Sequence, residues 1–183
     1  MTQYEHPTRL LVATDCIIFG FDGEALRLLL IKRNFEPEQG KWSLMGGFVN
    51  ENEDLEEGAE RILYDLTGLQ NIYVEQLKTF GQVKRDPLER TISVAFSALI
   101  NIHDHDEEAI KIHNAVWIDL KEKPKLIFDH DKMVDLALEE LRYNAALHPI
   151  GFEPQQAGLR GGRRVRGRSR VAATSLQDRS RCR

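Results

Sequence analysis

Apolar residues in this chain fall into short runs that predict β-strands, separated by clusters of glycine, proline and polar residues. The run at 10–21 is dominated by Leu, Val and Ile and predicts a buried strand. Asp22 and Gly23 form a hairpin signal that leads into a returning strand at 26–32. Further strands are expected at 42–44, 91–102 and 115–120, with one or two more between 71 and 84.

Two segments show instead the 3.6-residue period of an amphipathic helix. The first follows Gly46 and Gly47, with Asp54 as its N-cap, Glu57 completing a capping box and Gly68 ending it. Its apolar face is Leu55, Ala59, Ile62, Leu63 and Leu66. The second helix is expected at 131–146, with an apolar face of Met133, Leu136, Ala137, Leu141 and Ala145. Two helices among hairpin-connected strands predict an α/β fold, a mixed-sheet α/β/α sandwich.

Composition narrows the class of protein. The chain has 183 residues, of which 42% are hydrophobic and 30% are charged, which suits one globular domain with an extension. No apolar run is long enough to cross a membrane, and no membrane partner is expected. Cys16 lies in an apolar run and is expected to be a buried thiol, while Cys182 lies near the chain end. Two cysteines placed in this way indicate a reducing, cytoplasmic location.

The net charge of −4 hides two oppositely charged parts. Residues 1–153 hold 16 basic and 28 acidic residues, a net charge of −12. Residues 154–183 hold nine arginines and one acidic residue, Asp178, a net charge of +8. This basic Arg/Gly-rich tail offers little to bury, so we expect it to be disordered. Its composition indicates a frameshifted or vector-derived end, and the alternative is a natural tail that touches nucleic acid.

The stretch from Gly46 to Leu69 resembles the Nudix box, G-x5-E-x7-R-E-U-x-E-E-x-G-U, in which U is a bulky aliphatic residue. Gly47, Glu53, Arg61, Leu63 and the closing pair Gly68 and Leu69 match the motif. Three positions that are glutamates in the motif are Ile62, Asp65 and Leu66. The resemblance implies the α/β/α sandwich fold and an ion pair between Glu53 and Arg61.

The substitutions in the box bear on catalysis. In active Nudix hydrolases the box helix presents carboxylates to Mg²⁺ or Mn²⁺, and a hard cation of this kind needs oxygen ligands. Ile62 and Leu66 offer none, so no catalytic residue is assigned and no cofactor is expected. A working hydrolase would have to rebuild the metal site from Glu57, Asp65 and a loop carboxylate, Glu107 or Glu108.

Three further segments narrow the resemblance: 32–49 (KRNFEPEQGKWSLMGGFV), 81–96 (GQVKRDPLERTISVAF) and 126–153 (LIFDHDKMVDLALEELRYNAALHPIGFE). Over residues 8–153 the chain is similar to the sensor domain of Nudix-related bacterial transcriptional regulators. That group contains regulators of NAD metabolism that recognise ADP-ribose-type ligands, and arabinose-responsive relatives. The resemblance implies a homodimer and a winged-helix DNA-binding domain after the PIGFE motif, where this chain has the basic tail instead.

Polar residues around the glycine loop are the candidate ligand contacts, although each is also compatible with an ordinary surface role. The candidate set is Arg33, Glu36, Lys41, Gly46, Gly47, Arg85, Asp86, Glu89 and Arg90. Trp42 is expected to be a core aromatic residue rather than a stacking platform. The alternating His and Asp residues at 103–106 are expected to form a solvated loop rather than a metal site.

Three hypotheses on function follow. The first is a ligand-sensing Nudix-like domain of a bacterial transcriptional regulator that binds a sugar or nucleotide metabolite without hydrolysing it. The second is an active Nudix hydrolase, such as an ADP-ribose pyrophosphatase, that uses Mg²⁺ or Mn²⁺. The third is non-specific nucleic-acid binding through the basic tail. The altered box favours the first hypothesis over the second, and the acidic charge of residues 1–153 disfavours the third.

Overall fold

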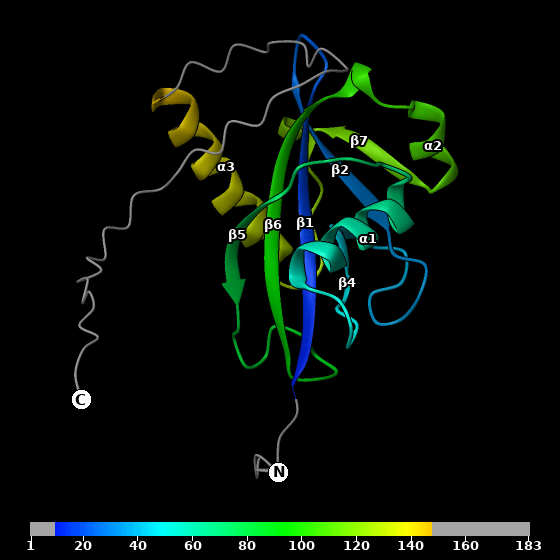
Figure 1. Cartoon of the computed structure of the whole chain (residues 1–183), viewed down its shortest axis with the longest axis vertical. Coiled ribbons are helices and arrows are strands. Elements are labelled where there is room, and N and C mark those ends of the chain that lie inside the picture. Colours follow the sequence, from blue (N-terminus) through cyan, green and yellow to red (C-terminus); the bar gives the residue numbers. More distant parts are fainter. Residues whose placement is uncertain (1–9, 148–183) are drawn as a thin grey trace, which may run out of the picture. The chain divides into compact units, whose positions relative to one another are not determined.

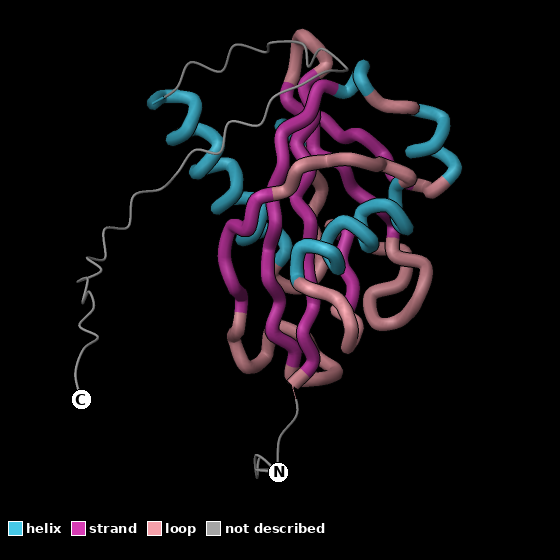
Figure 2. Tube along the Cα trace, viewed as in Figure 1, coloured by secondary structure: helices cyan, strands magenta, loops and turns pink. Residues whose placement is uncertain are grey.

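The computed structural model describes residues 10–147, which form the elements in Figure 1 and Figure 2. The basic tail at 154–183 and the outer limits of the expected 8–153 domain lie outside the described residues. The strands are β1 (Leu11–Phe21), β2 (Leu26–Lys32), β3 (Trp42–Ser43), β4 (Met45–Phe48), β5 (Glu75–Phe80), β6 (Thr91–Asn101) and β7 (Ala115–Asp119). The helices are α1 (Leu55–Thr67), α2 (Glu107–Ile112) and α3 (His130–Leu147), with short 3₁₀ turns η1 (Ile102–Asp104) and η2 (Leu120–Glu122).

The strands form one mixed sheet with β1 at its centre. The main order is β3-β2-β1-β6-β5, while β4 pairs with β1 and β7 pairs with β2. β1 runs parallel to β6 over its whole length, and the other pairings are antiparallel. A parallel pair needs a long crossover connection, and α1 and β5 belong to that connection. The predicted mixed sheet is therefore confirmed.

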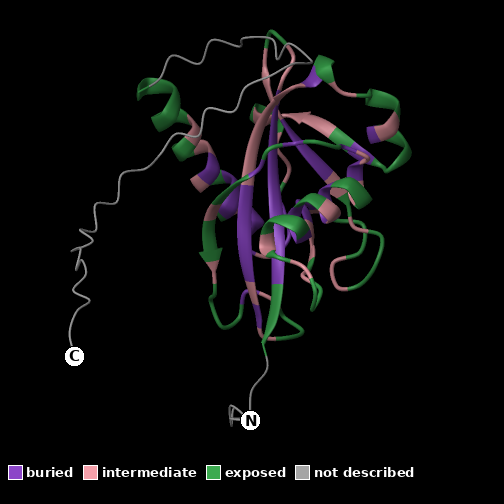
Figure 3. Ribbon diagram, in the orientation of Figure 1, coloured by how far each residue is buried: buried purple, intermediate pink, exposed green. Residues whose placement is uncertain are grey.

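The core has two layers, one on each face of the sheet, and Figure 3 shows the long central strands buried between them. Alternate residues of β1 pack into the two layers, because successive side chains of a strand point to opposite faces of the sheet. Cys16 and Ile18 pack with Ala59 and Leu63 of α1. Ile17 and Phe19 pack with Met133, Val134 and Ala137 of α3. The fold is the predicted α/β/α sandwich, and Cys16 is the expected buried thiol.

Helix α1 has the ends that the sequence predicts. Asp54 is its N-cap, and both hydrogen bonds of the capping box with Glu57 are present. Gly68 follows the helix with φ of 73°, a left-handed conformation that glycine adopts without strain. Such ends satisfy backbone groups that would otherwise lack partners. Beneath the glycine loop, a Cβ on Gly47 would lie 3.0 Å from the Ile62 side chain, so loop and helix are in close contact.

Two local expectations were wrong. The polar segment at 103–106, expected as a solvated loop, contributes to η1 and to the N-cap of α2, because Asp106 accepts hydrogen bonds from the backbone N–H groups of Glu108 and Ala109. The second predicted helix exists as α3, but Ala145 on its expected apolar face is exposed. The buried residues of α3 lie in its first half, Leu141 still packs against the core, and residues 142–147 are exposed.

Candidate functional site

A cavity of about 580 Å³ opens where the end of β2, the following loop, β3 and the start of β7 meet the last turns of α1 and α2. Its volume is within the range of ordinary small-molecule sites. Its lining residues are Ile31, Lys32, Arg33, Asn34, Phe35, Trp42, Ser43, Leu44, Gly46, Leu66, Lys111, His113, Asn114, Ala115 and Val116. Apolar and polar side chains therefore contribute to the lining in equal measure.

The charge of this lining is of one sign. Lys32, Arg33 and Lys111 line the cavity, and among residues 10–147 no Asp or Glu does. The contrast with the surrounding chain is strong, because residues 1–153 carry a net charge of −12. A cavity lined by cations attracts anionic groups such as phosphates. The arrangement suits a ligand that carries both negative charge and apolar or aromatic surface.

Two of the cations lie over aromatic rings. The Lys32 ammonium is 5.0 Å from the centroid of the Trp42 ring, and the Arg33 guanidinium is 3.9 Å from the centroid of the Phe35 ring. The Arg33 Nε is buried and has no hydrogen-bond partner among residues 10–147. Partial burial lowers the pKa of Arg33, while the carboxylates of Asp86 and Asp15 act in the opposite direction. Arg33 thus brings a charged group with one unsatisfied, buried donor to the cavity wall.

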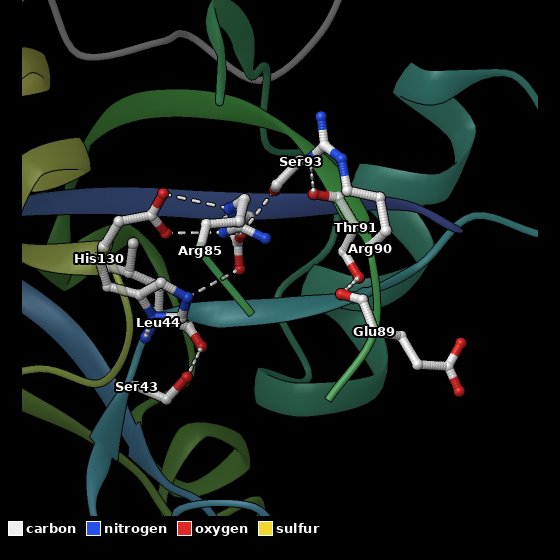
Figure 4. A network of polar contacts seen from close by, with 10 residues as sticks. Ser43, Leu44, Arg85, Glu89, Arg90, Thr91, Ser93 and His130 are labelled. Atoms are coloured by element: carbon white, nitrogen blue, oxygen red, sulfur yellow. Dashed lines mark hydrogen bonds and ion pairs between the residues drawn. The ribbon is translucent and has the colours of Figure 1, made fainter. Parts of the chain in front are cut away.

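Behind the cavity lies a buried ionic cluster, formed by Asp15, Arg85, Ser93, Asp129 and His130 (Figure 4). The Arg85 guanidinium donates to both carboxylate oxygens of Asp129, at 2.8 and 3.1 Å. It also lies 3.4 Å from Asp15 Oδ2, which accepts a hydrogen bond of 2.5 Å from the Ser93 hydroxyl. Buried charges are tolerated when they are paired in this way.

His130 joins this cluster to the cavity wall. Its Nδ1 accepts a hydrogen bond of 3.2 Å from the backbone N–H of Leu44, and its Nε2 lies 3.4 Å from Asp15 Oδ1. Burial lowers the pKa of His130, an effect that Asp15 partly opposes. The ring is therefore neutral at pH 7, with Nδ1 as acceptor and the proton on Nε2 facing Asp15.

The box helix carries the ion pair that the resemblance implied. Arg61 donates to both carboxylate oxygens of Glu53, at 2.6 and 2.9 Å, and also to the carbonyl oxygen of Phe48. The Arg61 hydrogen bonds and a backbone N–H from Asn50 lower the pKa of Glu53 from 4.5 to about 2. These bonds fix the glycine loop to α1, a structural role that involves no reacting group.

The residues of the box do not fit a hydrolytic metal centre. Ile62 is buried beneath Gly47, and Leu66 presents an aliphatic side chain to the cavity. Asp65 lies 3.6 Å from Arg61 and is outside the cavity lining. Within residues 10–147, no group of three or more His, Cys, Asp or Glu residues is placed to hold a metal ion. A divalent cation needs several oxygen ligands, so no catalytic step is assigned through a metal here.

The carboxylates that a rebuilt metal site would need are engaged elsewhere. Glu57 accepts a hydrogen bond of 2.9 Å from the Asp54 backbone N–H. Glu107 and Glu108 both pair with Lys111 on the exposed face of α2. The structure therefore does not assemble the alternative set considered from the sequence.

The candidate ligand residues divide into two groups. Arg33 and Gly46 line the cavity, whereas Glu36, Lys41, Gly47, Arg85, Asp86, Glu89 and Arg90 do not. Arg85 is not a solvated turn residue but the centre of the buried cluster. Arg90 closes its own loop by donating to the carbonyl oxygens of Gly81 and Gln82. A ligand contact from the 85–90 turn stays a prediction.

Several site residues escaped the sequence analysis. Trp42 was expected in the core, and it does pack against the hydrophobic core beside α3, but it also lines the cavity. Lys111 and His113 reach the cavity through α2, a helix that the sequence did not predict. Asp15 offered a usable signal, since a carboxylate inside an apolar strand requires a buried partner.

Comparison with known proteins identifies the family. The model of the NUDIX domain matches residues 9–137, more than half of the chain. The chain belongs to the Nudix family. This Nudix domain is 34% identical over 165 residues to the "ADPR responsive transcriptional repressor NtrR" of Acinetobacter baylyi, covering 84% of the chain and 65% of that repressor. It is also 35% identical over 131 residues to the ADP-ribose pyrophosphatase of Methanocaldococcus jannaschii, covering 72% of the chain and 73% of that enzyme.

Solved structures that are similar to this chain include a regulator, NrtR. The NUDIX domain of Shewanella oneidensis NrtR, solved with ADP ribose, is 30% identical, with a TM-score of 0.63, over 73% of this chain and 90% of that domain. The longer Shewanella NrtR chain has a TM-score of 0.64 at the same identity, and this chain covers 65% of it. The Nudix domain described here thus spans about two thirds of the length of these regulators. No helix within residues 10–147 has the length and apolar character needed to cross a membrane.

Proposed function

We propose that this chain is the ligand-sensing Nudix domain of a bacterial transcriptional regulator and that it binds an ADP-ribose-type nucleotide without hydrolysing it. The observation that carries the proposal is the cavity, whose lining within the described part of the chain combines three cationic side chains with aromatic surface and includes no carboxylate. A diphosphate-linked nucleoside offers the matching negative charge and a planar base. The similarity to an ADPR-responsive repressor and to a NUDIX domain solved with ADP ribose supports this ligand class.

The chemistry of the cavity supports sensing rather than hydrolysis. Hydrolysis in active family members relies on a metal held by box carboxylates. Ile62 and Leu66 replace two of them by aliphatic groups, and Leu66 lies in the cavity wall. Loss of metal ligands costs several kcal/mol of barrier, and each ~1.4 kcal/mol is a factor of about ten in rate. We propose that the domain needs no cofactor for its function.

We further propose that the regulator acts as a homodimer and contacts DNA through a winged-helix domain rather than through this Nudix domain. Residues 1–153 carry a net charge of −12, which disfavours contact with a DNA backbone. Shewanella NrtR has been solved with a 27mer DNA, which supports a DNA-binding role for regulators of this type. Cytoplasmic location follows from such a role.

Calorimetric titration with ADP-ribose, NAD and arabinose tests the ligand class. ADP-ribose is expected to bind and to raise the melting temperature, because a ligand that binds only the folded state stabilises it. Arg33→Gln should weaken binding, since it removes a cation of the cavity lining, whereas Arg27→Gln, on the preceding strand β2 and outside that lining, should leave it unchanged. If only arabinose binds, the ligand is a free sugar and the proposed nucleotide is wrong. If none of the three binds at millimolar concentration, the proposal is refuted.

The second candidate function is ADP-ribose hydrolysis, which the similarity to the Methanocaldococcus pyrophosphatase favours. Phosphate-ester products should be measured with ADP-ribose, NADH and diadenosine polyphosphates in Mg²⁺ or Mn²⁺. We expect no useful turnover from the parent, and metal-dependent turnover near 1 s⁻¹, about the low end of ordinary enzyme rates, would overturn the sensor proposal. The triple variant Ile62→Glu, Asp65→Glu, Leu66→Glu restores the motif, and activity gained by it alone would locate the loss in the box.

A further inference from the structure

The first turn of α3 is built on the buried ionic cluster. The carbonyl oxygen of Asp129 accepts hydrogen bonds from the backbone N–H groups of Lys132 and Met133, at 3.0 and 3.3 Å. The Asp129 carboxylate is held by Arg85, and His130 is the first residue of the helix. The direction in which α3 leaves the domain therefore depends on this cluster.

The same cluster forms part of the support of the cavity wall. Ser43, Leu44 and Gly46 line the cavity, and the backbone N–H of Leu44 donates to His130 Nδ1. Gly46 lies directly against Asp15, since a Cβ at position 46 would overlap Asp15 Oδ1. Figure 4 shows the His130 ring next to Leu44 and Ser43. A ligand that moves this wall changes the surroundings of His130 and Asp15.

Phe128 contacts both the cavity and the start of α3, and its backbone is strained. Phe128 has φ of 49°, a left-handed conformation that is unusual for a bulky residue. Its ring centroid lies 5.8 Å from the Arg33 guanidinium in the cavity and 5.8 Å from the His130 ring, in an edge-to-face arrangement. Strain of this kind persists only where the surroundings hold it, and it concentrates at switch regions.

We propose that residues 128–130 couple ligand binding in the cavity to the position of α3. This inference rests on the proposed function. It adds the route by which a ligand bound in the cavity would change the position of α3. Two sites are defined, the cavity and α3, and one element contacts both, as an allosteric coupling requires. Because removing one partner of a buried ion pair leaves an uncompensated charge, the cluster favours discrete arrangements over gradual distortion.

The shape of α3 suits this role. Its 18 residues span about 27 Å, and its buried residues all lie in the first half. In the second half, Leu141 still packs against the core, whereas Tyr143 and Leu147 near the end are exposed. A tilt of about 5° at the first turn moves the far end by about 2 Å, from the length of the helix alone. A small change at His130 is therefore enlarged at the free end.

Hydrogen exchange of peptides from α3, with and without saturating ADP-ribose, tests the coupling. In the wild-type domain the ligand is expected to change exchange in the first turns of α3 by at least about fivefold, the lower end of ordinary coupling free energies. Phe128→Gly keeps the backbone conformation accessible and removes the ring, and His130→Gln removes the imidazole. In both variants ADP-ribose should still bind, while the change at α3 should fall below about twofold.

Matched controls separate the coupling from general destabilisation. Asn71 also has positive φ, at 57°, but lies outside the cavity and the cluster, and His103 is an exposed histidine bonded to the Asp22 carbonyl oxygen. Asn71→Gly and His103→Gln should keep the full response. An unchanged α3 in the wild type despite ADP-ribose binding, or a full response in Phe128→Gly and His130→Gln, would overturn the coupling.

A second measurement needs no ligand, so that it decides the coupling even if ADP-ribose does not bind. Arg33→Gln changes only the cavity end of the route. The free variant is expected to show altered hydrogen exchange at 128–133, because the Arg33 guanidinium lies 5.8 Å from the centroid of the Phe128 ring. Values equal to those of the wild type would show that cavity and helix are independent. Absence of ADP-ribose binding together with a positive Arg33→Gln result would refute the proposed ligand and leave the coupling established.

Discussion

Replacement of Arg85 by methionine is the sharpest test of the buried cluster. Arg85 is only 8% exposed, and its guanidinium makes two hydrogen bonds to Asp129 and one ion pair to Asp15. Methionine has a similar length and no charge, so the variant leaves two carboxylates buried close together. Asp129, which precedes α3, and Asp15 then lose their shared partner.

The magnitude follows from the burial. Breaking a buried ion pair by removing one partner costs about 3–5 kcal/mol of unfolding free energy. For a chain of this size that loss lowers the melting temperature by about 6–20 °C. Urea unfolding, followed by circular dichroism, measures the free energy directly, and an unchanged slope with denaturant would confirm that only stability has changed.

Arg90→Met is the matched control, because Arg90 lies in the same loop and donates only to carbonyl oxygens and to no carboxylate that the structure describes. It should cost about 1 kcal/mol or less. The double variant Arg85→Met, Asp129→Asn should lose less than the sum of the single variants by about 0.5–3 kcal/mol. An Arg85→Met protein within about 0.5 kcal/mol of wild type, the range of ordinary surface substitutions, would refute the reasoning.

Three further predictions concern the cavity wall and the titrating groups. Gly46→Ala places a Cβ on the Asp15 carboxylate and should destabilise the domain by about 1–3 kcal/mol, measured by thermal unfolding, whereas no loss would mean that Asp15 moves freely. Glu53 has a lowered pKa, so its contribution is present above pH 4.5 and is lost as pH falls towards about 2. The melting-temperature difference between wild type and Glu53→Gln should therefore shrink over that range, and a constant difference would contradict the Glu53–Arg61 pair. His130 has a lowered pKa, so the unfolded state binds its proton first and stability should fall as pH drops below 6.5. His130→Gln should flatten that part of the pH profile, and an identical slope would show that another group titrates there.

Local signals explain which parts of the fold the sequence could predict. The limits of α1 are set by Asp54, Glu57 and Gly68, whose effects act within a few residues of each helix end. Strand β2 has the predicted limits because its apolar run is bounded by turn residues. Helix α2 was missed because it has only six residues and its N-cap, Asp106, looked like one more polar loop residue.

The buried cluster and the cavity are built by contacts between residues far apart in the sequence, and such contacts leave no local sequence pattern. Arg85 and Asp129 are 44 positions apart, and Arg85 and Asp15 are 70 positions apart. The sequence around Arg85 is that of a charged turn, and only the fold shows that its side chain points into the core. Arg33 was identified because it flanks the glycine loop, whereas Lys111 was not, since its approach depends on α2.

The parallel pairing of β1 with β6 has a consequence for synthesis of the chain. Each residue of β1 pairs with one 80 positions later, so the centre of the sheet has high contact order and cannot form until β6 is available. At ordinary elongation rates of about 5–20 residues per second, β1 waits about 4–16 s for its partner. During that time β1 can pair with β2 and β4, but the edge that later pairs with β6 stays open to other chains. Chaperone dependence during translation should therefore centre on β1, and nascent chains that end before residue 101 should aggregate more than chains that extend through α3.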